Sequence, residues 1–179
     1  KTSIIKIFDY TLARTGLNKA ALDKMGLKHG TNLIVTGSTP GYYPGQKDII
    51  IEIYYDPKDK TIYGAEIFGE VGVDKRIDVL STAIYANLKM TDLQHLDLAY
   101  APPYSPAKDP VIVNGFVSSN VFNENYLEIS VEELVSDLDA KRDIQLLDVR
   151  SADEVLAQGT IHDAVNIDLH NLRNELNKL

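Results

Sequence analysis

The chain has 179 residues, of which 44% are hydrophobic and 25% are charged, and its formal net charge is −8 at pH 7. It contains no cysteine, which excludes disulfide bonds, thiolate metal sites and cysteine nucleophiles within the chain. Residues 1–117 carry 13 acidic and 13 basic side chains, whereas residues 118–179 carry 13 and 5. A neutral part followed by an acidic part indicates two units. It also argues against a nucleic-acid partner, which requires a basic face.

The N-terminus has no secretory signal, so the default expectation is a cytoplasmic location. No apolar run of about 18 residues is present, and we therefore expect no transmembrane helix and no membrane partner. The chain starts in an alternating, β-branched stretch, residues 3–8, and does not begin with Met. This start suggests that the chain is cut from a longer protein.

Residues 1–117 contain four predicted strands and four predicted helices. Alternation and β-branching predict strands over residues 3–8, 31–38, 48–55 and 61–71. Apolar spacing and capping residues predict helices over residues 19–25, 74–88, 92–96 and 110–121. A turn at residues 56–60 joins two of the strands into an antiparallel hairpin. We therefore expect an α+β fold, with helices on one face of an antiparallel sheet.

The rest of the chain has a different pattern. Helices are predicted over residues 130–138, 151–157 and 169–176, and strands over residues 145–149 and 164–167. Alternating strands and helices are typical of α/β folds, but two strands are too few for an independent parallel sheet. We predict a first domain over residues 1–117, a linker over residues 118–128 and an incomplete α/β half-domain over residues 129–179.

Two proline-rich loops carry tyrosines: Thr39-Pro40-Gly41-Tyr42-Tyr43-Pro44-Gly45 and Tyr100-Ala101-Pro102-Pro103-Tyr104-Ser105-Pro106. A phenol held on a stiff loop can donate a proton or a hydrogen bond to a thiolate leaving group. Tyrosine is also enriched at protein interfaces, so the rings could simply pack against a partner. The residues alone leave both interpretations open.

The most specific family resemblance is carried by residues 98–105, followed by Lys108-Asp109-Pro110. Thr15-Gly16-Leu17-Asn18, Tyr42-Tyr43-Pro44-Gly45 and Gly64-Ala65 add to it. These segments resemble the C-terminal dimerisation domain of FAD-dependent pyridine nucleotide-disulfide oxidoreductases, in the coenzyme A disulfide reductase and NADH oxidase branch. The resemblance implies a homodimer in which each chain places its tyrosine loops at the partner subunit's flavin and redox-cysteine site.

The same resemblance implies roles for individual residues. Tyr100 is expected to be catalytic as a proton donor to the coenzyme A thiolate, and Tyr42 is expected to share that role. Tyr43 and Tyr104 are expected to contribute to substrate binding, Tyr104 mainly as a structural residue, and whether Tyr42 or Tyr43 faces the site stays open. Glutathione-type and lipoamide-type reductases carry a His-Pro-Thr motif here, but Pro-Thr does not follow His95. We therefore expect no catalytic role for His95.

A second resemblance lies in the acidic part of the chain. Residues 129–134, Leu147-Asp148-Val149-Arg150 and residues 164–167 resemble the N-terminal half of a rhodanese domain. The resemblance implies that Asp148 and Arg150 are structural and fix a strand end through charge-assisted hydrogen bonds. The usual Gly-His-Ile-x-Gly-Ala segment is altered at residues 159–164. The cysteine loop would lie beyond Leu179, so we expect no sulfur transfer by this part alone.

The expected parent enzyme reduces coenzyme A disulfide, coenzyme A persulfide or polysulfide with FAD and NADH or NADPH. The alternatives are an NADH oxidase that reduces oxygen and a non-catalytic dimerisation module. No G-x-G-x-x-G phosphate cradle is present, so we expect that the chain alone binds neither FAD, NAD(P)H nor coenzyme A and is inactive. No histidine–carboxylate cluster has ligand spacing, and we predict no metal site.

Overall fold

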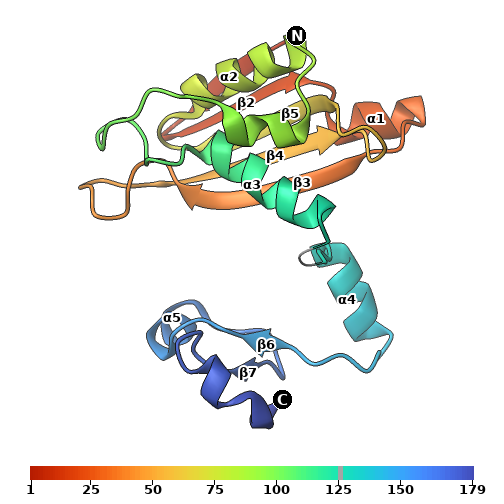
Figure 1. Ribbon diagram of the computed structural model, residues 1–179, viewed down its shortest axis with the longest axis vertical. Coiled ribbons are helices and arrows are strands. Elements are labelled where there is room, and N and C mark those ends of the chain that lie inside the picture. The colour runs from red at the N-terminus through yellow and green to blue at the C-terminus, as the bar shows by residue number, and fades with distance from the viewer. Residues whose placement is uncertain (125–126) are drawn as a thin grey trace. The chain divides into compact units, whose positions relative to one another are not determined.

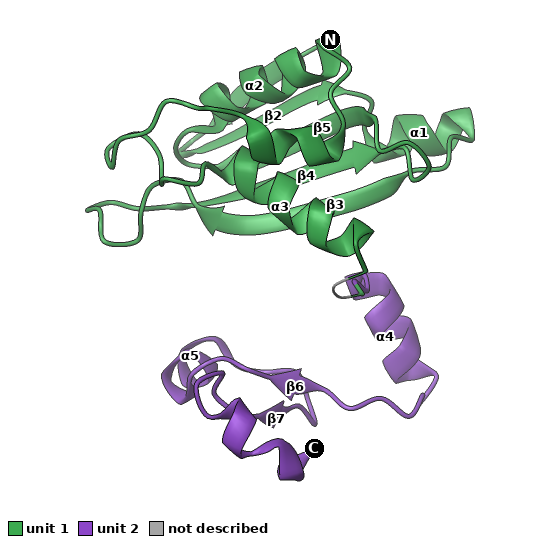
Figure 2. Cartoon of the chain, in the orientation of Figure 1, with its two compact units in different colours: residues 1–127 green, residues 128–179 purple. Residues whose placement is uncertain are grey.

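A five-stranded antiparallel sheet, with strands in the order β1-β2-β5-β4-β3, lies at the centre of residues 1–127 (Figure 1). The strands are β1 (Ser3–Ile7), β2 (Tyr10–Gly16), β3 (Gly30–Gly37), β4 (Asp48–Tyr55) and β5 (Ile62–Gly69). The computed structural model describes residues 1–124 and 127–179. They divide into a first unit, residues 1–127, and a second unit, residues 128–179 (Figure 2). No described helix is long and apolar enough to cross a membrane.

Helices cover one face of this sheet, which confirms the predicted α+β fold (Figure 1). α2 (Val73–Tyr85) and α3 (Pro110–Phe122) pack against the sheet, and the 3₁₀ helix η1 (Met90–His95) packs against α3. α1 (Lys19–Met25) lies at one end of the sheet (Figure 1). The side chain of Asn18 caps α1, and Gly26 ends it in the left-handed region, as the sequence predicts. Alternate residues of β4 and the inner face of α2 form the buried core, including Ile49, Ile51, Ile53, Ile77 and Leu80.

Strand β2 was not among the predicted elements. It pairs with β1 through a two-residue connection, Phe8-Asp9, with Ile7 opposite Tyr10. Phe8 has φ 54°, in the left-handed region that two-residue hairpin turns need but that favours glycine or asparagine. The turn therefore carries none of the usual residues that would announce a hairpin.

The linker predicted over residues 118–128 begins inside a helix, since α3 continues to Phe122. Two contacts with the sheet explain this continuation. The Asn32 side-chain amide donates to the Ser118 hydroxyl over 2.5 Å, and the Phe122 ring packs edge-on against Tyr55. Residues 125 and 126 of the predicted linker lie outside the described residues.

The second unit holds two parallel strands, β6 (Leu147–Asp148) and β7 (Val165–Asn166), which form a separate two-stranded sheet. Its helices are α4 (Val131–Asp139) and α5 (Ala152–Gln158), and both begin with a serine–glutamate capping box. The helix predicted over residues 169–176 is instead two 3₁₀ turns, η2 (Leu172–Asn174) and η3 (Leu176–Lys178). Ile167 is the only buried hydrophobic side chain among the described residues of this unit, so little apolar packing supports a longer helix there.

Candidate functional site

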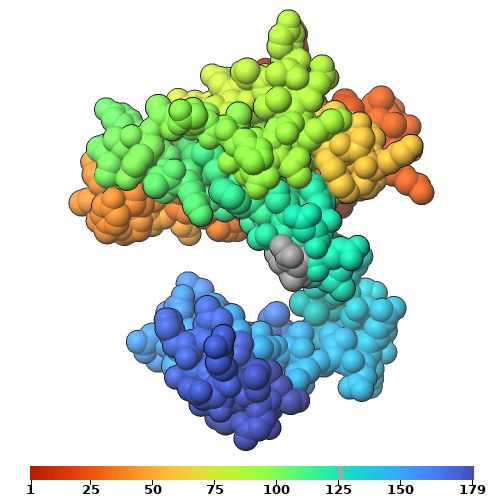
Figure 3. All heavy atoms as spheres, viewed as in Figure 1, coloured from red at the N-terminus to blue at the C-terminus, as the bar shows by residue number. Residues whose placement is uncertain are grey.

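The four tyrosines singled out in the sequence lie on two loops at the same end of the first unit (Figure 1). The first tyrosine loop (residues 38–47) joins β3 to β4, and the second tyrosine loop (residues 99–108) precedes α3. Tyr42, Tyr100 and Tyr104 are 76%, 54% and 72% exposed, and Tyr43 is half-buried. Both loops reach the molecular surface, the first in orange and the second in green (Figure 3).

The first tyrosine loop is closed by its own backbone. The Tyr43 amide donates to the Pro40 carbonyl over 2.8 Å, and the Gln46 amide donates to the Tyr43 carbonyl over 3.2 Å. At its base, the Ser38 amide donates to the Lys47 carbonyl over 2.8 Å. These turns direct the Tyr42 ring outward, whereas Tyr43 lies partly against the protein.

The second tyrosine loop is a turn fixed at its end by Ser105. The Tyr104 and Ser105 amides both donate to the Ala101 carbonyl, over 2.8 and 3.0 Å. The buried Ser105 hydroxyl donates to the Asp109 carboxylate over 2.8 Å. Asp109 is also the N-cap of α3 and accepts from the Val111 amide over 3.0 Å. The loop is therefore anchored to the start of α3.

Arg76 of α2 joins the bases of the two loops. Its side chain is 1% exposed, and its Nε lies 3.1 Å from a carboxylate oxygen of Asp109. Its Nη2 donates to the Ser38 carbonyl over 2.9 Å and lies 3.4 Å from the Ser105 hydroxyl. Nη1 donates to the Gly72 carbonyl over 3.1 Å. One guanidinium thus contacts the first tyrosine loop, the second tyrosine loop and the helix cap together.

The Asp109 carboxylate is charged despite its burial. Burial by itself raises the pKa of a carboxyl group, but the Arg76 guanidinium, the Val111 amide and the Ser105 hydroxyl outweigh it. The pKa of Asp109 therefore stays below its usual value, and at neutral pH it forms a buried ion pair with Arg76.

Sequence reasoning missed Arg76 as a site residue. A signal was present, because Arg76 stands three residues after Val73 and four before Leu80 and so falls on the buried face of α2. A buried cation requires an anion, and Asp109, directly before the helix predicted over residues 110–121, supplies it. The two are 33 residues apart in the chain, so only the fold brings them together.

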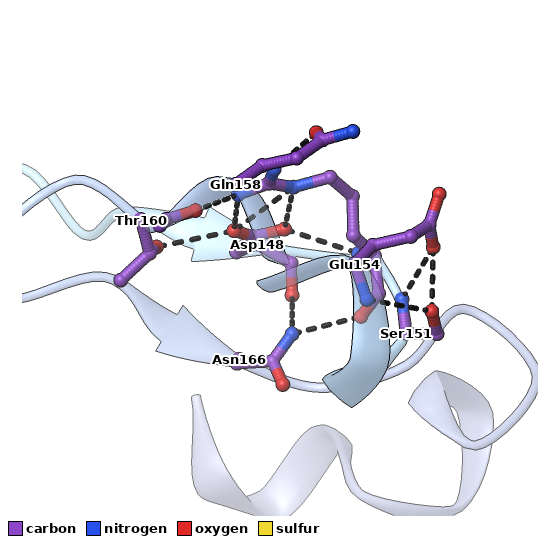
Figure 4. A network of polar contacts seen from close by, with 8 residues as sticks. Asp148, Ser151, Glu154, Gln158, Thr160 and Asn166 are labelled. Atoms are coloured by element: carbon purple, nitrogen blue, oxygen red, sulfur yellow. Dashed lines mark hydrogen bonds and ion pairs between the residues drawn. The ribbon is translucent and has the colours of Figure 1, made fainter. Parts of the chain in front are cut away.

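In the second unit, Asp148 and Arg150 form the centre of a polar network (Figure 4). The Arg150 guanidinium donates to both Asp148 carboxylate oxygens and, over 2.8 Å, to the Gly159 carbonyl. The Thr160 hydroxyl donates to Asp148, and the Asn166 amide donates to the Asp148 and Arg150 carbonyls. Side-chain and backbone hydrogen bonds from Arg150 hold the pKa of Asp148 well below its usual range. The network joins β6, the end of α5 and β7.

Other candidates contribute little to the site. His95 is exposed at the end of η1, and the His29 ring packs edge-on against Tyr54. Over residues 1–124 and 127–179, no group of three or more histidine or carboxylate side chains is placed to hold a metal ion.

Comparison with known proteins identifies similar sequences and structures. The family model for the pyridine nucleotide-disulphide oxidoreductase dimerisation domain matches residues 2–110, more than half of the chain. Coenzyme A disulfide reductase of Staphylococcus haemolyticus is 39% identical over 115 residues, which are 64% of this chain and 26% of that protein. The chain therefore spans about a quarter of the length of this curated relative.

Solved structures extend the similarity to the whole chain. Reduced Bacillus anthracis CoADR-RHD is 39% identical with a TM-score of 0.92, covering 99% of this chain and 31% of that one. An NAD-dependent persulfide reductase from A. fulgidus is 38% identical with a TM-score of 0.87 and the same coverage. A water-forming NADH oxidase from Lactobacillus brevis is 19% identical with a TM-score of 0.65, covering 69% of this chain and 28% of that one, and shares the fold.

Proposed function

This chain belongs to the family of pyridine nucleotide-disulphide oxidoreductase dimerisation domains, and from that premise we propose that it is the C-terminal part of a homodimeric flavoenzyme. The proposed enzyme uses NAD(P)H and FAD to reduce coenzyme A disulfide, coenzyme A persulfide or polysulfide. Support comes from the names of the similar proteins, a coenzyme A disulfide reductase and a persulfide reductase.

One observation carries the part assigned to this chain. Tyr42 and Tyr100 are exposed on two stiff loops whose bases are joined by Arg76. Such a pair of phenols is available to a pocket built by another protomer, which is where the proposal places them. Tyr43, half-buried beside Tyr42, would line that pocket, and Tyr104 would contribute from the outer part of its loop.

The proposed chemistry is protonation of a thiolate. Attack of an enzyme thiolate on coenzyme A disulfide breaks its S–S bond, joins one coenzyme A to the enzyme and expels the other as a thiolate. The Tyr100 hydroxyl donates a proton or a hydrogen bond to that leaving sulfur. The Tyr42 hydroxyl, on the other loop, shares this role by donating a hydrogen bond to the same sulfur. A phenol, with a pKa of about 10, is a weaker acid than a thiol, with a pKa of about 8.5, so complete proton transfer to the thiolate is uphill by about 1.5 pKa units and a hydrogen bond is favoured. If the proton is transferred, solvent must return one to the phenolate.

The cofactors would be held outside this chain. NAD(P)H would supply the two electrons of the reduction, and FAD would pass them on. The chain has no glycine-rich strand–turn–helix that could cradle their phosphates, so its residues fit a role in proton donation and dimerisation.

For the second unit we propose the N-terminal half of a rhodanese domain over residues 129–179, following a dimerisation domain and a linker. The Asp148–Arg150 network supports this, because it fixes a strand end by charge-assisted hydrogen bonds. The second unit also lies within the part of the chain that resembles CoADR-RHD. Pairing of the two modules favours persulfide chemistry for the parent enzyme.

The test uses the full-length enzyme with Tyr100→Phe and Tyr42→Phe, assayed with coenzyme A disulfide, coenzyme A persulfide, polysulfide and oxygen. Removing a general acid should lower thiol-forming turnover by about 10²-fold for Tyr100→Phe. Tyr85→Phe is the matched control, since Tyr85 is 90% exposed at the end of α2 and is expected to retain full turnover.

Two results would contradict the proposal. Full turnover in Tyr100→Phe with a weakened dimer, measured by analytical ultracentrifugation, would favour the interaction module. NADH consumption by oxygen that outpaces every sulfur substrate would favour the oxidase.

A further inference from the structure

Two consecutive cations in the first turns of α2 hold opposite ends of the second tyrosine loop. Lys75 Nζ donates to the carbonyl of Ala99, the residue before Tyr100, over 3.1 Å. Arg76 Nη2 lies 3.4 Å from the hydroxyl of Ser105, the residue after Tyr104. The segment between these contacts contains both tyrosines of the loop.

The same cations share one anion, and Arg76 also reaches the first tyrosine loop. Asp109 lies 3.4 Å from Lys75 Nζ and 3.1 Å from the Arg76 guanidinium. Arg76 donates in addition to the carbonyl of Ser38, which begins the loop that carries Tyr42. The three charged groups thus connect two chain segments that touch through no strand pairing.

We infer that Lys75 and Arg76 are positioning residues, which fix the two loop bases to one another and thereby set the separation of Tyr42 and Tyr100. This inference rests on the proposed function of the two tyrosines. Both rings are exposed and cannot be held by core packing, so their placement depends on the loop bases. A displacement of about 1 Å in a reacting group can cost up to about 10²-fold in rate.

A role in stabilising the fold alone explains the contacts of Lys75, Arg76 and Asp109 less well than a role in positioning the loops. Buried ion pairs are weak contributors to stability compared with apolar residues of similar volume. Arg76 directs two of its hydrogen bonds to Ser38 and Ser105, at the bases of the loops, and none to the sheet strands. Its fork of donors suits this task, since a guanidinium can hold several acceptors in a fixed geometry.

Lys75→Met in the full-length enzyme is the primary test. It removes the contact with Ala99 but leaves Asp109 paired with Arg76, so the fold should survive. Lys89→Met is the matched control. Lys89 is 39% exposed against 32% for Lys75 and pairs with Asp59 over 2.9 Å. It lies near the start of β5, at the end of the sheet opposite the tyrosine loops.

The expected result is that Lys75→Met lowers kcat by about tenfold with little change in KM, whereas Lys89→Met stays within about twofold. Hydrogen exchange supplies a readout that does not depend on catalysis. The Tyr104 and Ser105 amides, which donate to Ala101, should exchange faster in Lys75→Met and not in Lys89→Met.

A double variant separates positioning from general damage. If Lys75 acts through Tyr100, then Lys75→Met added to Tyr100→Phe should cause no further loss of kcat, since coupled residues are not additive. Independent, multiplicative losses would overturn the inference, as would unchanged amide exchange in Lys75→Met. Full activity in Tyr100→Phe would instead refute the proposed function, and the exchange rates would still decide whether Lys75 holds the loop.

Discussion

The two units of this chain are stabilised in different ways. In the described part of the chain, 19 buried hydrophobic residues lie in the first unit and one, Ile167, lies in the second. The first unit therefore has an apolar core between a five-stranded sheet and its helices. The second depends on capping boxes and on the Asp148–Arg150 network, which join its short elements by charge and hydrogen bonds. Polar contacts can hold local geometry, but they are a poor substitute for a core.

The largest expected effect comes from the one place where the first unit relies on buried charge. Arg76→Met should leave Asp109 buried with only Lys75 beside it and should destabilise the first unit by about 3–5 kcal/mol. Urea unfolding followed by tyrosine fluorescence would measure the change. Arg14→Met, an exposed change on β2, is the control and should shift the free energy of unfolding by less than about 0.5 kcal/mol. A small effect of Arg76→Met would mean that the ion pair is dispensable.

A leucine-to-alanine substitution in each unit should show the difference in apolar packing most directly. Leu80→Ala, at a fully buried position of α2, should cost about 2–5 kcal/mol. Leu156→Ala, at an 87% exposed position of α5, should cost less than about 0.5 kcal/mol. Equal costs in thermal or urea unfolding would show that α5 has an apolar partner and would break the comparison.

Acid should unfold the second unit before the first. Hydrogen bonds from Arg150 lower the pKa of Asp148, the Ser130 amide lowers that of Glu133, and the Ser151 hydroxyl lowers that of Glu154. A carboxyl group with a lowered folded-state pKa stabilises the fold fully above its unfolded-state pKa of about 4, and this contribution is lost as the pH falls further.

The apolar core of the first unit does not titrate, although Asp109 contributes in the same direction. Amide NMR spectra of the chain recorded from about pH 6 to about pH 3 would show which resonances disappear first, in the range where carboxyl groups titrate. Simultaneous loss in both units would contradict the expected order.

The smallest effect concerns a strained turn in the otherwise well-supported first unit. Phe8 adopts φ 54° and is 91% exposed, so its ring contributes little packing that could offset the left-handed backbone. Phe8→Gly should therefore raise the free energy of unfolding by about 0.5–1 kcal/mol. Lys6→Gly, within strand β1, is the contrasting variant and should lower it. Urea unfolding of the two variants would show whether the free energy of unfolding rises for Phe8→Gly and falls for Lys6→Gly.

Local signals explain which elements the sequence could predict. The hairpin of β4 and β5, the capped helix α1 and the start of α3 at Asp109-Pro110 each depend on residues close together in the chain. Strand β2 escaped prediction because its turn uses Phe8 where glycine or asparagine is usual. In the second unit the strands shorten to two residues because few apolar contacts reinforce them.

In the candidate site, too, features set by neighbouring residues could be predicted and features set by distant contacts could not. The tyrosine loops could be found from their prolines, and their exposure follows from lying outside the sheet. The residues that hold the loops are harder to find. Lys75 has the pattern of an ordinary helix position, and although the spacing of Arg76 places it on the buried face of α2, its partners Ser38 and Asp109 become evident only in the fold. Contacts between residues 24 to 38 positions apart depend on the fold rather than on local pattern.

Exposure of Tyr42 and Tyr100 on loops of the first unit also has a genetic consequence under the proposed function. A side chain donated to a neighbour's pocket can be supplied by a different gene copy from the one that encodes the pocket. A cell carrying one allele without Tyr100 and another without a working redox centre would assemble mixed dimers that each contain one complete pocket. Two alleles that are inactive alone would then complement each other.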